Sequence, residues 1–173
     1  MSVTVRPVAD ADAMAAAKSI RTAVFIEEQA CPPEEEWDGH DATARHLLAV
    51  LDDTPDAPAP DADVVLEDGV AVGTARWRTV PHGDALVAKL ERFAVRAPYR
   101  GRGVGTQLVR AAIAHAEQAG FTTQKLHAQA HLETYYARFG FASTGKRFTE
   151  AGIPHVAMVR TSTDAAHAPT DVA

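Results

Sequence analysis

The sequence predicts an α/β fold, and three observations support it. Short strand-like runs recur between turn residues, a strand–turn–helix unit lies near the middle of the 173-residue chain, and apolar residues follow that turn at helical spacing. The strand of this unit is Lys89–Val95, and Pro98 ends it because proline has no N–H to give to a sheet. The helix after the turn ends near Gly120, and its apolar stripe consists of Leu108, Val109, Ala112, Ile113 and Ala116.

Before this unit the chain is predicted to form a strand, a helix, a second strand and a hairpin. Asp10 can cap the helix, since a side-chain oxygen satisfies an unpaired N–H of the first turn. Prolines 32 and 33 end the helix, and an acidic loop follows over residues 34–41. The predicted ranges are Ser2–Val8, a helix from Asp10 toward Gln29, Arg45–Leu51 and a hairpin over Val64–Val80 that places Trp77 in or near the core. An exposed, flexible loop is predicted at Asp52–Asp63.

After Gly120 we expect a strand, a short helix and two final strands. The first of these strands, Lys125–Ala130, should pair in parallel with Lys89–Val95, because a crossover helix joins the two. The short helix is predicted at Leu132–Phe139, and the last strands begin at Phe141 and Ile153. The length favours a single domain, residues 1–161, and the Asp-, Ala- and Pro-rich tail 162–173 is predicted to be disordered.

Composition narrows the function classes. A formal net charge of −6 argues against nucleic acid as a general partner. We find no signal peptide and no apolar stretch long enough to span a bilayer, so the expectation is a cytoplasmic protein without membrane contact. The single cysteine, Cys31, forms no disulfide framework, and eight scattered histidines show no ligand spacing. No metal site is predicted.

The glycine-rich turn after Lys89–Val95 predicts an anion site. The turn reads Arg100-Gly101-Arg102-Gly103-Val104-Gly105, and a helix starts at once. Glycine lets the backbone approach a ligand closely, and the first N–H groups of a helix favour phosphate. From Lys89 to Arg110 the chain has six basic residues and one acid. The nucleoside-triphosphate loop is absent and a dinucleotide fingerprint fits badly.

Two motifs carry a resemblance to a known family. Arg-x-x-Gly-x-Gly after a strand ending in Ala-Val resembles the acetyl-CoA loop of the GCN5-related N-acetyltransferases (GNAT family). Tyr135-Tyr136-Ala137-Arg138-Phe139-Gly140-Phe141 is similar to the family's (L/F)Y-x-x-(L/F)-G-F signature. The segment from Arg21 to Asp41, which includes Glu28-Gln29, Cys31-Pro32 and Asp38-Gly39, resembles the ElaA/YjcF-like branch.

This resemblance implies a mixed, mostly antiparallel sheet of six or seven strands with a splayed parallel pair at the cofactor site. It implies acetyl-CoA as co-substrate, with the pantetheine arm entering between the splayed strands by β-augmentation. Strand backbone and loop would hold the cofactor through Phe93, Ala94, Val95, Arg100, Gly101, Arg102, Gly103, Val104, Gly105 and Thr106. The acidic loop would receive a cationic amine.

The resemblance also supplies catalytic candidates. Tyr136 stands at the position of the family's tyrosine, five residues before the last Phe of the signature, Phe141. A phenol there can act as the general acid, since it can donate a proton to a departing thiolate. Tyr135 is the alternative hydroxyl. His127 stands where several family members carry a glutamate that acts as the general base. A histidine can serve as a base because its ordinary pKa is near neutrality. Glu28 is a second candidate for the general base, and Glu27 and Glu91 are further candidates. The family's usual Asn-x-x-Ala is missing at the last helix, where His131 and Glu133 stand.

The predicted activity is transfer of an acetyl group from acetyl-CoA to a primary amine by direct attack in a ternary complex. A non-catalytic acyl-CoA-binding or sensing protein on the same fold is the alternative from another class, and a protein or peptide N-acetyltransferase is a third. Small-molecule or peptide amines are therefore the expected partners. The acyl chain length is left open, as is the oligomeric state, with a homodimer among the options.

Overall fold

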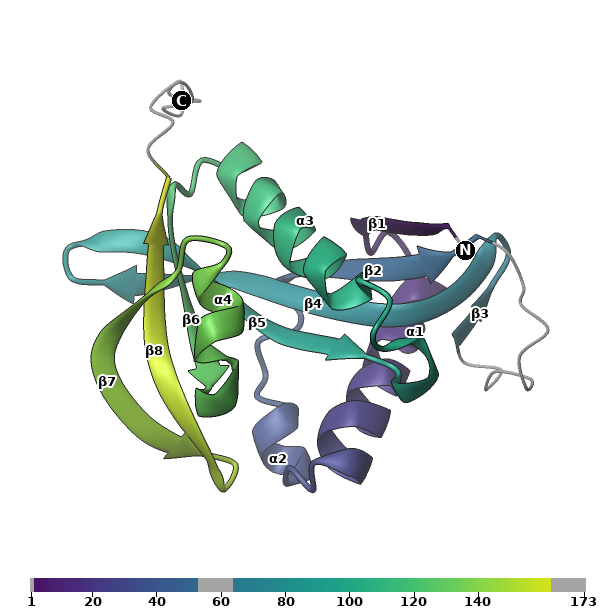
Figure 1. Cartoon of the computed structure of the whole chain (residues 1–173). Helices are drawn as coiled ribbons and strands as arrows, with labels where there is room; N and C mark the ends of the chain where they lie inside the picture. The colour runs from purple at the N-terminus through teal and green to yellow at the C-terminus, as the bar shows by residue number, and fades with distance from the viewer. Residues whose placement is uncertain (1, 53–63, 163–173) are drawn as a thin grey trace. The chain divides into compact units, whose positions relative to one another are not determined.

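The computed structural model describes residues 2–52 and 64–162 (Figure 1). The predicted flexible loop and disordered tail lie, apart from Asp52 and Ser162, outside these ranges. Within them, no helix is both long and apolar enough to cross a membrane. Eight strands form one sheet in the order β1-β2-β4-β5-β6-β8-β7, and β3 pairs with β4 beside that path. The mixed, mostly antiparallel sheet predicted from the sequence is confirmed, and the strand beyond the predicted six or seven is the two-residue β3.

The helices and strands come in the predicted order, except that a short helix, α2, occupies the start of the predicted acidic loop. The strands are β1 Val3–Pro7, β2 Arg45–Leu51, β3 Val65–Leu66, β4 Gly69–His82, β5 Ala85–Val95, β6 Thr123–Gln129, β7 Ala142–Glu150 and β8 Ile153–Thr161. The helices are α1 Ala11–Arg21, α2 Pro33–Glu36, α3 Val104–Gln118 and α4 Glu133–Ala137, with a π-helix at Thr22–Glu28 and 3₁₀ turns at Ala97–Tyr99 and Ala130–Leu132. The first helix thus ends as α-helix at Arg21 and continues as the wider π form.

The predicted parallel pair is β5 and β6. Its register joins Ala88 to Gln124 and Lys89 to Lys125. β5 continues to Val95 and β6 to Gln129, so the parallel register covers the early part of the pair. β6 also pairs along its whole length with β8, antiparallel, from Thr123 opposite Thr161 to Gln129 opposite His155.

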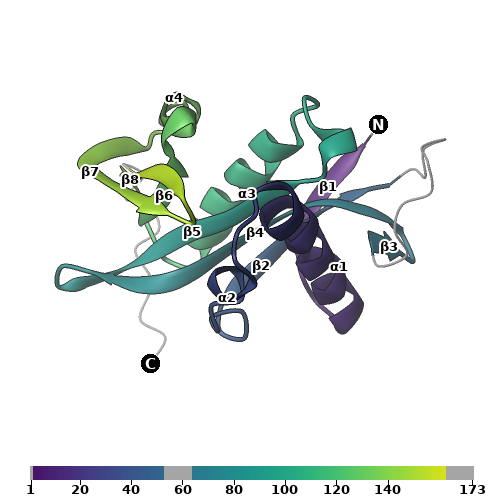
Figure 2. The ribbon, with the colours of Figure 1, turned by 90° about the horizontal axis from the view of Figure 1, so that it is seen from below.

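The chain divides into two compact units, and β4, β5 and α3 each pass from one unit to the other. Unit 1 consists of residues 1–76 and 92–111. In it β1 and β2 pair antiparallel, and α1 and the first half of α3 cover opposite faces of β2 and β4 (Figure 2). Asp10 caps α1 as predicted, because its Oδ1 accepts from the Ala13 N–H at 2.8 Å.

Unit 2 consists of residues 77–91 and 112–173. Its strands β6, β8 and β7 carry α4 beside them (Figure 1), and the second half of α3 packs on one face of β6. The buried Gln124 side chain marks that face, since its Nε2 donates to the Ile113 carbonyl of α3 at 3.0 Å. Trp77 is 2% exposed, which confirms its predicted core position. Side chains alternate along β6, so Lys125, His127 and Gln129 face away from α3.

Candidate functional site

The glycine turn in unit 1 has the backbone of an open cradle. Gly101 and Gly103 take φ angles of +73° and +82°, a left-handed region in which side chains are strained. An ideal Cβ built on either glycine would meet no atom within 4 Å. The helix α3 follows directly, and its Gln107 N–H donates to the Gly103 carbonyl at 3.0 Å. Glycine therefore suits both positions because of their positive φ angles and not because neighbouring atoms would exclude a side chain. The space around both Cβ positions is open.

A third glycine, Gly73 of β4, allows the helix to lie close to the sheet. A Cβ there would stand 2.9 Å from Leu108 Cδ1 and 3.0 Å from the Ala94 carbonyl oxygen. The start of α3 therefore packs tightly on β4 and the end of β5. The turn is fixed to this base by the Arg96 N–H, which donates to the Val72 carbonyl at 2.9 Å.

Arg100 and Glu28 lie together in unit 1. The two guanidinium Nη atoms of Arg100 approach both Glu28 carboxylate oxygens at 2.9 Å, and its Nε donates to the Val95 carbonyl at 2.8 Å. Arg100 thus joins the glycine turn to the π-helix and to the end of β5. In this arrangement Nε and both Nη atoms of Arg100 contact protein groups.

The acidic loop of unit 1 is tied to three arginines. We call this set the arginine–carboxylate network: Arg21, Arg76, Arg92, Glu36, Asp38 and Asp41. Arg21 Nε lies 2.6 Å from Glu36, Arg76 Nη2 2.7 Å from Asp38, and Arg76 Nη1 2.8 Å from Asp41. Arg21 and Arg76 are fully buried. These three carboxylates are therefore already paired, which differs from the expected role in receiving a cationic amine.

Within the network the pKa values of Asp38 and Asp41 are lowered, whereas the pKa of Glu36 is raised. Burial raises the pKa of Asp38, but hydrogen bonds from Arg76 and the His40 amide, with the charges of Arg76 and Arg92, outweigh it and hold the pKa well below its usual value. The pKa of Asp41 is lowered in the same way, against burial, by Arg21 and Arg76. Burial dominates at Glu36, so its pKa is raised despite Arg92 and Arg21.

Arg92 connects the network to the strand that precedes the turn. It has a φ of +59° inside β5, a strained conformation for a residue with a side chain. Its Nε lies 2.9 Å from Glu36 and its Nη2 3.2 Å from Asp38. The ion pairs hold this irregular point directly before Phe93–Val95, the predicted cofactor-binding backbone.

Tyr136 lies in unit 2, on α4. Its side chain is buried, with the ring edge-on to Phe141 and to Tyr135 at centroid distances of 6.4 and 5.1 Å. Burial, with a smaller contribution from Tyr135, raises the pKa of the Tyr136 phenol well above its usual value. The phenol therefore keeps its proton at working pH, as a general acid must before it donates.

His127 belongs to a second group in unit 2, which we call the histidine–glutamate cluster: His127, Glu150 and His155. Glu150 Oε1 lies 3.5 Å from His127 Nδ1, and Glu150 Oε2 lies 3.8 Å from His155 Nε2. Phe148 packs between the histidines, edge-on to His127 at 4.7 Å and stacked on His155 at 5.8 Å. The strand registers place all four side chains on one face of β6, β8 and β7.

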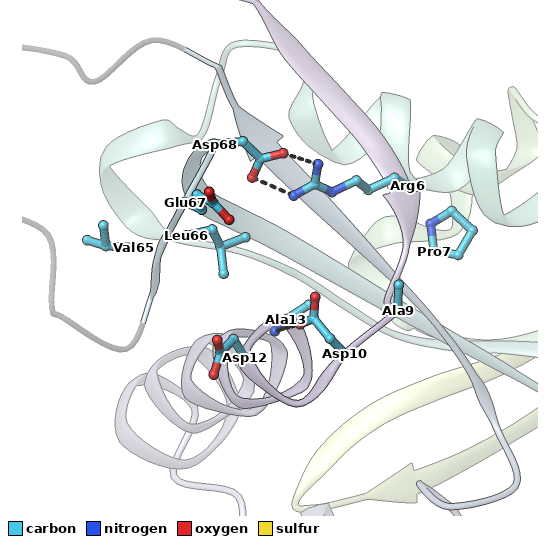
Figure 3. A pocket seen from close by; sticks show the side chains of 10 residues that line it. All are labelled: Arg6, Pro7, Ala9, Asp10, Asp12, Ala13, Val65, Leu66, Glu67 and Asp68. Atoms are coloured by element: carbon cyan, nitrogen blue, oxygen red, sulfur yellow. Dashed lines mark hydrogen bonds and ion pairs between the residues drawn. The ribbon is translucent and has the colours of Figure 1, made fainter.

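A separate pocket of about 430 Å³ lies in unit 1 between the start of α1 and the β3–β4 turn (Figure 3). Arg6 and Asp68 form a bidentate pair at its wall, and Asp10 is used as the helix cap. None of the predicted site residues lines this pocket.

The profile of the acetyltransferase (GNAT) domain matches residues 59–162. The chain belongs to the GNAT family. YjcF of Bacillus subtilis (strain 168), described as an uncharacterized N-acetyltransferase, is 30% identical over 142 residues, which is 82% of this chain and 87% of YjcF.

Two solved structures extend the likeness to the GNAT fold. ElaA of Escherichia coli has a TM-score of 0.70 and 28% identity, covering 92% of this chain and 99% of ElaA. An acyl-CoA N-acyltransferase from Pseudomonas aeruginosa has a TM-score of 0.72 and 31% identity, again covering 92% and 99%. The resemblance drawn from the sequence to the GNAT family and to ElaA and YjcF is confirmed.

In this GNAT chain the predicted site residues fall into two groups. The glycine turn, Phe93–Val95 and Glu28 belong to unit 1; Tyr136 and His127 belong to unit 2. Sequence reasoning missed the three network arginines and Glu150. Arg76 gave a usable signal, since it is a charged residue within the mostly apolar run 70–77 of β4. Glu150 gave none, because the β7–β8 hairpin register brings it to His127.

Proposed function

We propose that this GNAT chain is an N-acetyltransferase that moves an acetyl group from acetyl-CoA to a primary amine by direct attack in a ternary complex. The observation that carries the proposal is the open turn between β5 and α3, with Gly101 and Gly103 both at positive φ. Backbone amides at such a turn and at a helix start suit a pyrophosphate. The P. aeruginosa relative, named as an acyl-CoA N-acyltransferase, supports the same donor class.

The chemistry needs one proton acceptor and one proton donor. The amine nitrogen attacks the thioester carbonyl, a C–N bond forms and the C–S bond breaks. His127 takes the proton that the amine loses, and Tyr136 gives its phenolic proton to the departing CoA thiolate. Backbone N–H groups at the end of β5 stabilise the oxyanion. Glu28 is the less favoured base here, because both its carboxylate oxygens already contact Arg100.

The first test is calorimetric titration with acetyl-CoA and with free CoA. Wild type should bind both, and Gly103→Trp should lose binding because the indole fills the open cradle. Gly145→Trp is a matched control: Gly145 also has a φ of +82° and open space around its Cβ, but lies in β7. Absence of binding to either ligand by the wild type would overturn the proposal.

Turnover is tested by thiol release over a panel of small amines and peptides that carry free amino groups. Tyr136→Phe should keep acetyl-CoA binding and lose about 10²-fold or more in kcat, since it removes the general acid. A wild type that binds acetyl-CoA but releases no thiol with any acceptor would favour an acyl-CoA sensor instead.

A further inference from the structure

The histidine–glutamate cluster contains a buried ring nitrogen of His127. His127 Nδ1 is buried and, among the described residues, has no hydrogen-bond partner closer than Glu150 at 3.5 Å. That distance is longer than an ordinary hydrogen bond. Catalytic hydrogen bonds are often long without substrate and tighten in the reacting complex, so Glu150 is the group positioned to accept from this nitrogen.

We propose that Glu150 is a positioning residue that holds His127 in the tautomer a general base requires, with the proton on Nδ1 and the lone pair on Nε2. This inference rests on the proposed function, in which His127 accepts the proton of the amine. An imidazole can accept a proton only through its unprotonated nitrogen, and the hydrogen bond at one ring nitrogen decides which nitrogen that is. Glu150 therefore directs the lone pair to the opposite edge of the ring.

The second histidine does not compete for this role while it is neutral. His155 Nδ1 lies 2.7 Å from the Ile153 carbonyl, which can only accept, so the proton of a neutral His155 is on Nδ1. Its Nε2 then faces Glu150 at 3.8 Å with a lone pair rather than a proton. The Glu150 carboxylate is left for His127 until His155 becomes protonated.

Other charges around the cluster keep Glu150 ionised. The contact with His127, which outweighs burial, and the nearby charges of His127, Lys89 and His155 lower the pKa of Glu150. Lys89 on β5 acts on Glu150, and Lys89 is itself influenced by Glu91 on β5, Arg78 on β4 and Lys125 on β6. On β7, Lys146 Nζ lies 5.9 Å from the centroid of the Phe148 ring. Arg78 and Glu91 pair with each other at 2.5 Å.

The test compares two replacements of one carboxylate in the full chain. Glu150→Ala removes both the acceptor and the charge, whereas Glu150→Gln keeps an acceptor oxygen and removes the charge. Glu117→Ala is the matched control, because Glu117 pairs with Arg160 in the same unit and contacts no member of the cluster in the described ion pairs. Long-range ¹H–¹⁵N NMR spectra identify the protonated nitrogen of His127 without any turnover.

In the wild type the His127 spectrum should show the Nδ1–H tautomer, and in Glu150→Ala this tautomer should be lost. Thiol-release assays should show kcat reduced about ten- to hundred-fold in Glu150→Ala with the KM for acetyl-CoA unchanged. Glu150→Gln should retain more activity than Glu150→Ala, because its amide oxygen can still accept from Nδ1 of His127. Glu117→Ala should change none of these.

An Nε2–H tautomer in the wild type, or a His127 spectrum unchanged in Glu150→Ala, would overturn the inference. So would a kcat in Glu150→Ala equal to that of the wild type. If the tautomer depends on Glu150 but the wild type turns over no amine, the positioning role is supported and the proposed function alone fails.

Discussion

Two groups of charged side chains in this GNAT chain solve different physical problems. In the arginine–carboxylate network of unit 1, the ion-pair distances run from 2.6 to 3.2 Å and the side chains of Arg21 and Arg76 are at most 1% exposed. In the histidine–glutamate cluster of unit 2, the charged contacts are 3.5 and 3.8 Å, and the Glu150 side chain is 49% exposed. The network therefore has short contacts around buried arginines, whereas the cluster has longer contacts to a half-exposed carboxylate.

The difference indicates which group can change its protonation during a reaction. Arginine stays charged throughout the working pH range, so the network holds fixed ion pairs and suits a structural task, the support of β5 at Arg92. Imidazole titrates near neutral pH, and a long contact leaves room for a proton to move. The acids of the two groups therefore differ in role: those of the network hold backbone in place, whereas Glu150 is proposed to position a base.

The largest expected effect follows from breaking the network at its most buried arginine. Arg76→Met removes one of the two arginine partners of Asp38 and of Asp41, and leaves both carboxylates partly buried and undercompensated. We expect a loss of about 3–5 kcal/mol in the free energy of unfolding, measured by urea denaturation. Arg45→Met, at the exposed start of β2, is the matched control and should change little. Equal losses in both variants would mean that Arg76 in the network contributes no more to the free energy of unfolding than an exposed arginine does.

The network also shows where sequence reasoning reached its limit. The order of elements, the Asp10 cap, the glycine turn and the Tyr136 signature could all be predicted, because each depends on residues close together in the chain. The pairs Arg21–Glu36, Arg76–Asp38 and Arg92–Glu36 join segments 15, 38 and 56 positions apart, as the residue numbers give. Nothing local encodes those partners, so the acidic loop looked like an open receptor for amines.

A second prediction uses pH to test the network. Asp38→Asn keeps the shape but removes the charge that Arg76 and Arg92 need, and should cost roughly 1.5–3 kcal/mol at pH 7. The pKa of Asp38 is lowered in the folded state, so the stability from its ionised form is fully present above about pH 4, the usual aspartate pKa. It is lost as the pH falls through the folded-state pKa.

Urea denaturation of the two proteins between pH 7 and pH 2.5 measures this difference. The gap between wild type and Asp38→Asn should narrow as the medium becomes more acidic. A gap that stays constant over that range would show that the charge of Asp38 does not carry the effect.

The third prediction separates strain from charge at Arg92. Arg92→Ala and Arg92→Gly both remove the ion pairs with Glu36 and Asp38, but glycine adopts the φ of +59° without strain. Arg92→Gly should therefore be more stable than Arg92→Ala by about 1 kcal/mol. Thermal denaturation of the pair checks it, and acetyl-CoA titration shows whether the cofactor strand keeps its geometry. Identical stabilities would mean that β5 relaxes once the ion pairs are gone.

Replacing Glu150 in the cluster should have the smallest effect on stability. It therefore tests directly whether the cluster, unlike the network, is free of a structural role. Glu150 is half exposed and its contacts to both histidines are long, so Glu150→Gln should change the free energy of unfolding by less than about 1 kcal/mol. Arg76→Met and Glu150→Gln would then show opposite profiles in the same two assays, one losing stability and the other losing rate with its stability intact. If Glu150→Gln instead destabilises the protein as much as Arg76→Met does, the cluster is part of the structural framework, and a lower rate in that variant would no longer indicate a role in positioning His127.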